Sequence, residues 1–89
     1  MIPTLSKEVF RQELFELFSE YVEPGTEISD RSTLFGDLGL DSVRIMEIVA
    51  KIEDRFGITF GESVLFGINT MKDVCRLVGD RLQEVGKLK

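Results

Sequence analysis

The sequence predicts an all-α fold, a small antiparallel bundle of three main helices plus a short extra helix, with a long loop between the first two helices. Two observations lead to this prediction. Apolar residues recur at helical spacing in three separate segments, and none of these amphipathic segments can bury its apolar stripe alone. The chain also has 89 residues, the length of one domain, so residues 1–89 are expected to form a single domain around one core.

The first helix is expected over residues 6–22. Ser6 can cap its start, because a serine hydroxyl accepts a hydrogen bond from a free amide of the first turn. Pro24 and Gly25 follow the segment and mark where the helix cannot continue. The apolar residues have the spacing i, i+4, i+7, i+8 and i+11 of one helical face, and they are Phe10, Leu14, Leu17, Phe18 and Tyr21.

The segment of residues 23–40 shows neither a helical nor a strand period, and it contains Pro24 and three glycines. A loop of this length is uncommon in a compact domain and is usually functional or disordered. Here the loop has apolar residues of its own, so we expect it to pack across the bundle. The expected anchors are Ile28, Leu34, Phe35 and Leu38.

The second helix is expected over residues 41–56. The Asp41 carboxylate can cap the free amides of its first turn and interacts favourably with the positive end of the helix dipole. Gly57 suits the left-handed position that ends a helix. A single short helical turn is expected further on, over residues 62–66.

The last helix is expected over residues 70–85. Thr70 and Asp73 form a pair like a capping box, and a regular apolar stripe follows them. Gly86 ends the stripe. Residues 87–89 are expected to form a frayed, solvated end of the chain.

The composition excludes several classes of function. The chain has no histidine and one cysteine, so zinc clusters, Cys/His and Ser/His/Asp catalysis, and an internal disulfide are unavailable. Its formal net charge of −5 argues against binding a nucleic-acid backbone. No segment is long enough to span a membrane, and the first twenty residues hold no secretory signal. We therefore expect a cytoplasmic protein that binds no metal, nucleic acid or membrane, and a monomer, because one core uses all the apolar stripes.

One segment departs from the ordinary requirements of a bundle. Residues 36–43 read Gly-Asp-Leu-Gly-Leu-Asp-Ser-Val, so a glycine-punctuated acidic loop brings Ser42 to the first turn of a helix. Free backbone amides and the helix dipole at that position favour a phosphate group attached to the serine oxygen. The alternative is that Asp41 and Ser42 are only cap residues. The spacing of the residues alone favours the cap interpretation.

The ordered set of residues around Ser42 resembles the phosphopantetheine attachment region of acyl carrier proteins and related peptidyl carrier domains. The set runs from Asp37 through Asp41-Ser42 to an acidic helix residue, Glu47, and then to residues 53–58, which read Glu-Asp-Arg-Phe-Gly-Ile. The helix and loop layout also matches, so the resemblance covers nearly the whole chain. It implies that a phosphopantetheinyl transferase attaches 4'-phosphopantetheine from coenzyme A to the Ser42 hydroxyl.

The resemblance also implies roles for the neighbours of Ser42. Asp41 would cap the helix and help the transferase to dock, while Gly39 and Leu40 would shape the turn that exposes the serine. The protein would not be an enzyme. It would hold acyl intermediates as thioesters on the arm and present them to acyl-loading, condensing or tailoring enzymes. The partner-binding surface implied beside the arm consists of Asp37, Val43, Met46 and Glu47.

The charges depart from the pattern of carriers in central fatty-acid synthesis, whose second helix is strongly acidic. Here residues 42–56 carry as many basic as acidic side chains, and the negative charge lies in the preceding loop. Charge pattern sets encounter rate and partner choice. We therefore expect a dedicated carrier of a fatty-acid-like, polyketide or nonribosomal peptide pathway. Arg44 resembles what aminoacyl and aryl carriers often show, and Val43 replaces a more usual leucine.

The segment around Ser42 also admits other interpretations. An unmodified helical adaptor, or a degenerate carrier that acts only by binding other proteins, would share every core residue, so only the state of Ser42 separates it from a carrier. Ser42 as a catalytic nucleophile fails because no histidine can take its proton. A metal loop of Asp37, Asp41 and Glu47 does not match the spacing of a calcium loop.

Overall fold

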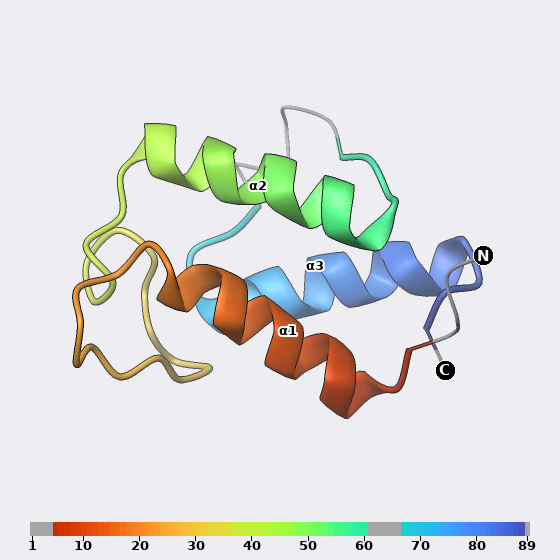
Figure 1. Ribbon diagram of the computed structural model, residues 1–89, viewed down its shortest axis with the longest axis horizontal. Helices are drawn as coiled ribbons and strands as arrows, with labels where there is room; N and C mark the ends of the chain where they lie inside the picture. The colour runs from red at the N-terminus through yellow and green to blue at the C-terminus, as the bar shows by residue number, and fades with distance from the viewer. Residues whose placement is uncertain (1–4, 61–66, 89) are drawn as a thin grey trace.

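The computed structural model describes residues 5–60 and 67–88, and it contains the helices α1 (Lys7–Ser19), α2 (Ser42–Phe56) and α3 (Met71–Glu84). Figure 1 shows α1 running antiparallel to α2 and α3, with the long loop at the end of the bundle where α2 begins. The chain leaves α2 at one end of the bundle and enters α3 at the other, so these two helices point the same way. The predicted helical bundle is confirmed. The short helix expected over residues 62–66 lies outside the described residues.

Helix α1 begins as predicted and ends earlier than predicted. Ser6 caps it, because its hydroxyl accepts a hydrogen bond from the amide of Val9 at 3.2 Å. The helix ends at Ser19, whereas the sequence predicted an end at residue 22. The chain tightens there, since the amide of Tyr21 donates to the Phe18 carbonyl at 3.0 Å, three residues back.

The two later helices have the caps that the sequence predicted. The Asp41 carboxylate caps α2, and Gly57 follows α2 with a φ of 66°. Thr70 and Asp73 form a complete capping box at the start of α3. Gly86, with a φ of 73°, turns the chain after α3.

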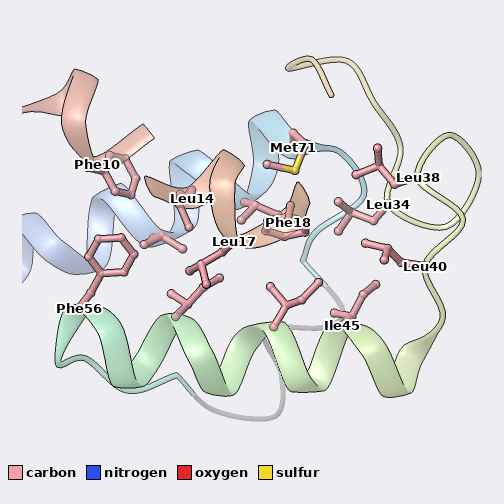
Figure 2. Packing of buried hydrophobic residues seen from close by; sticks show 14 of the residues in the cluster. Phe10, Leu14, Leu17, Phe18, Leu34, Leu38, Leu40, Ile45, Phe56 and Met71 are labelled. Atoms are coloured by element: carbon pink, nitrogen blue, oxygen red, sulfur yellow. The ribbon is translucent and has the colours of Figure 1, made fainter. Parts of the chain in front are cut away.

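The loop between α1 and α2 packs on the core at most of the predicted points. Leu34 and Leu38 are buried, and Ile28 packs half-buried against the core. The prediction was wrong for Phe35, whose side chain is 53% exposed. Figure 2 shows the loop leucines, including Leu40, meeting side chains of α1, α2 and α3 in one cluster. The loop therefore closes the end of the bundle.

The expectation of a frayed end at residues 87–89 is wrong for the described residues 87 and 88. The amide of Lys87 donates to the Leu82 carbonyl at 2.8 Å, which completes the helix-ending turn at Gly86. The Lys87 ammonium then donates to the Phe56 carbonyl at 3.1 Å and the Gly57 carbonyl at 2.8 Å. The tail thus ties the end of α3 to the end of α2.

Candidate functional site

The site begins with a closed turn in the loop. The Thr33 amide donates to the Asp37 carboxylate at 2.9 Å, and the Asp37 amide donates back to the Thr33 hydroxyl at 2.8 Å. The amide of Leu38 donates to the Thr33 carbonyl at 3.0 Å. This reciprocal pair holds the turn while Asp37 stays exposed. Asp37, predicted to face partners, therefore also has a structural task.

Gly39 and Leu40 carry the chain from this turn into α2. Gly39 has a φ of 66°, and a Cβ built on it would meet no atom within 4 Å, so glycine is needed there for its backbone and not for space. Leu40 is only 3% exposed, and its amide donates to the Leu34 carbonyl at 3.0 Å. The Leu40 side chain is thus a core anchor that fixes the turn, and it offers no contact surface.

Asp41 and Ser42 form the entry to α2. One oxygen of the Asp41 carboxylate accepts a hydrogen bond from the Arg44 amide at 2.8 Å, and the Asp41 carbonyl accepts from the Ile45 amide at 3.0 Å. Ser42 is the first helical residue and is exposed. The amides of Ser42 and Val43 come before the first bonded amide, so they have no partner within the helix. A phosphate on the Ser42 oxygen would meet them at the positive end of the helix dipole.

The apolar and acidic residues predicted for the partner surface are all exposed beside this entry. Val43 is 66% exposed, Met46 is 54% exposed, and Glu47 is also exposed. Their spacing of i, i+3 and i+4 places them on one side of α2. Exposed apolar side chains on a helix are typical of surfaces that bind other proteins.

Phe35 is the exposed residue that sequence reasoning missed. The run of apolar residues in the loop made it look like a core anchor. The signal that could have found it is the pair Thr33 and Asp37, four residues apart and of types that close a turn. Such a turn places Leu34 and Leu38 on one side, toward the core, and leaves Phe35 on the other.

The positive charges of α2 are arranged unevenly. The Lys51 ammonium lies 3.6 Å from the carboxylate of Glu20, the residue that follows α1. The Arg55 guanidinium lies 3.9 Å from the Glu13 carboxylate of α1. Arg44 forms no ion pair with any described residue. Among the described residues, Arg44, two residues beyond Ser42, is therefore the cation of α2 that has no ion-pair partner.

Within residues 5–60 and 67–88, no three His, Cys, Asp or Glu side chains are grouped so that they could hold a metal ion. None of the helices described is both long and apolar enough to cross a membrane.

Comparison with known proteins identifies the family. A family model described as the phosphopantetheine attachment site matches residues 12–78. The acyl carrier protein of Saccharopolyspora erythraea is 33% identical in an alignment of 75 residues that covers 79% of this chain and 79% of its own. The chain belongs to the acyl carrier protein family.

Other relatives of this carrier agree. The actinorhodin polyketide synthase acyl carrier protein of Streptomyces coelicolor is 29% identical over 86 residues, covering 94% of this chain and 98% of its own. The crystal structure of the acyl carrier protein of Thermotoga maritima has the same fold, with a TM-score of 0.72, 24% identity, and coverage of 89% of this chain and 93% of that chain. The cofactor of the family is 4'-phosphopantetheine, and its members are carriers and not catalysts.

Proposed function

We propose that this carrier holds acyl-type intermediates as thioesters on a 4'-phosphopantetheine arm attached to Ser42. It presents them to partner enzymes of a dedicated fatty-acid-like, polyketide or nonribosomal peptide pathway. The observation that carries the assignment to Ser42 is its place as the exposed first residue of α2. The Asp41 carboxylate accepts the hydrogen bond of the Arg44 amide, so the amides of Ser42 and Val43 remain available to a phosphate on Ser42.

Loading of the arm requires a base from the transferase. The Ser42 oxygen forms the new bond to phosphorus, the pyrophosphate bond of coenzyme A breaks, and adenosine 3',5'-bisphosphate leaves. The serine proton needs an acceptor, and the chain has no histidine to provide one. The nearest carboxylate along the chain, Asp41, is already hydrogen-bonded to the helix amide. The carrier therefore supplies the acceptor hydroxyl and its placement, and the transferase supplies proton transfer.

The attached arm supplies a terminal thiol that carries cargo as a thioester, and the tether keeps that cargo at high effective concentration beside any docked enzyme. The residues around Ser42 fix the position of its backbone. The closed turn at Asp37, the left-handed Gly39 and the buried Leu40 fix the loop, and the Asp41 cap fixes the start of α2. Partner enzymes then meet Ser42 on a rigid end of the bundle.

The pathway proposal is supported by the charges that a partner would meet. Because Lys51 and Arg55 are paired with acids of α1 and its end, the docking side of α2 presents Arg44 next to Ser42. Val43 and Met46 add exposed apolar area there. A partner adapted to a strongly acidic helix would meet the Arg44 cation instead, which lowers the encounter rate and the specificity of binding. The relative from the actinorhodin polyketide synthase is consistent with a dedicated pathway.

The test of the arm is intact mass after incubation with coenzyme A and a broad-specificity phosphopantetheinyl transferase. We expect a gain of one phosphopantetheine group, and no gain in the Ser42→Ala variant. Circular dichroism of both proteins checks that they are equally helical. If the folded wild-type protein gains no mass, the proposal is wrong, and an unmodified adaptor or degenerate carrier takes its place.

The test of the pathway is loading of the holo carrier by an acyl transferase of central fatty-acid synthesis. The Arg44→Glu variant should be loaded faster than wild type, because it restores the acidic charge such enzymes meet. Lys7→Glu makes the same charge change on an exposed residue at the opposite end of the bundle and should leave the rate unchanged. Equal rates for Arg44→Glu and wild type would contradict the dedicated-pathway proposal.

A further inference from the structure

An open hollow of about 430 Å³ lies beside the turn that carries Ser42. Its walls come from three parts of the chain, namely residues 20–24 after α1, the turn residues Leu38 and Gly39, and Arg44 of α2. The glycine leaves open space on its side, since nothing lies within 4 Å of where a Cβ would be. Gly39 and Arg44, which line the hollow, lie three residues before and two residues after Ser42 in the chain, so the hollow is within reach of a long group attached to the serine.

The apolar space inside the bundle is much smaller. Among the described residues, the enclosed space between α2 and α3 has a volume of about 20 Å³ and is lined by core side chains such as Ile45, Ile48 and Val78. Measured in the same way, a cavity needs about 10–15 Å³ to hold one water molecule. This space holds no arm and no cargo unless the core opens.

We propose that the attached arm folds back into the hollow, with the Arg44 guanidinium against its phosphodiester. This inference rests on the proposed attachment at Ser42. A guanidinium is suited to a phosphate, because its planar set of donors matches two phosphate oxygens. Arg44 is free to make that contact, since none of the described acids pairs with it.

The rest of the hollow suits the pantetheine portion of the arm, which has a branched apolar carbon and two amides. Pro24 and Leu38 offer apolar wall, and the Glu23 carboxylate can accept a hydrogen bond from an amide N–H. The charge of Glu20 is balanced by the Lys51 ammonium at 3.6 Å, so it repels the phosphate less. Because the arm is tethered at Ser42, its effective concentration at these groups is of about millimolar order, and weak contacts suffice to hold it.

The experiment uses uniformly ¹³C,¹⁵N-labelled carrier loaded with unlabelled coenzyme A. Intact mass first establishes that the arm is attached, so a loading failure counts against the proposed function alone. Isotope-filtered NOE spectra then detect protein protons close to the methyl groups of the arm. We expect cross-peaks to the Tyr21 ring and to Pro24. Loaded protein without cross-peaks to residues 20–24, or with cross-peaks to α3 instead, overturns the inference.

Arg44 is tested separately in the holo form. In Arg44→Gln, we expect the ³¹P resonance of the phosphodiester to move and the cross-peaks to residues 20–24 to weaken several-fold. In the matched variant Lys7→Gln, both should stay as in wild type. Mass and circular dichroism check that each variant is loaded and folded. Unchanged ³¹P shift and cross-peaks in Arg44→Gln would remove Arg44 from the site.

Discussion

The Asp41 side chain has two separable properties, an acceptor oxygen that caps α2 and a negative charge beside Ser42. We predict that Asp41→Asn keeps the first and loses the second, whereas Asp41→Ala loses both. An asparagine oxygen can accept the same hydrogen bond from the Arg44 amide, because Asn and Asp are equally good N-cap residues. The pair of variants therefore separates helix capping from recognition by the transferase.

The magnitudes follow from the observed contact. Loss of the cap in Asp41→Ala should lower the free energy of unfolding by about 1 kcal/mol, which corresponds to a Tm about 4–8 °C lower for a domain of this size. Asp41→Asn should stay close to the wild-type Tm. A charge-assisted contact between the carboxylate and the transferase is worth about 1.5–3 kcal/mol. Its loss should lower kcat/KM for loading by about 10- to 150-fold in both variants.

The assay combines thermal melts with loading kinetics followed by intact mass. Ser6→Ala is the matched control, because it removes the corresponding cap of α1 and should lower the Tm without changing the loading rate of folded protein. Wild-type loading by Asp41→Asn would refute a role of the charge in docking. A Tm loss in Asp41→Asn as large as in Asp41→Ala would refute the capping argument.

Three further predictions concern stability. Leu40→Ala should lower the free energy of unfolding by about 2–5 kcal/mol in urea titrations, because the side chain is buried; a loss below about 1 kcal/mol would contradict its role as an anchor. Lys87→Met should lower the free energy of unfolding by about 1–2 kcal/mol, because its two hydrogen bonds to carbonyls at the end of α2 are lost. Lys7→Met should leave the free energy of unfolding almost unchanged, and equal losses in the two variants would contradict this role of Lys87. Hydrogen bonds, chiefly from the Thr70 amide, lower the pKa of Asp73 below its ordinary value of 3.8. Its stabilising contribution is thus complete above that value and is lost as the pH falls through the lowered pKa. The Tm advantage of wild type over Asp73→Asn should therefore be present at pH 7 and shrink below pH 3.8, and a gap independent of pH would contradict this.

The helices were predictable because their signals are local. The cap at Asp41 and the capping box of Thr70 and Asp73 each lie within four residues, and the apolar stripes repeat within one turn. The end of α1 was harder to predict, because the tight bond between Tyr21 and Phe18 has no distinct residue signature. The tie from Lys87 to the end of α2 joins residues about thirty apart in the chain, so no local pattern could predict it.

The candidate site likewise has features that the sequence predicted and features that only the packing of the helices decided. The motif around Ser42 predicted an exposed serine at a helix start, and the structure places it there. The equal count of charges on residues 42–56 did not reveal that Lys51 and Arg55 pair with acids of α1 and its end, while Arg44 pairs with none of the described acids. A count of charges contains no information on which side of a helix meets a neighbouring helix.

The sequence by itself determined the helical class, the helix starts and the placement of Ser42 at the head of α2, since apolar period, cap residues and glycine positions act over a few residues. Only the tertiary structure decided that Phe35 faces outward, that Lys87 bonds to the end of α2, and that Arg44, which pairs with none of the described acids, lines a hollow. The physical reason is that exposure, ion pairing and cavities depend on which elements pack together. Those contacts join residues far apart in the chain.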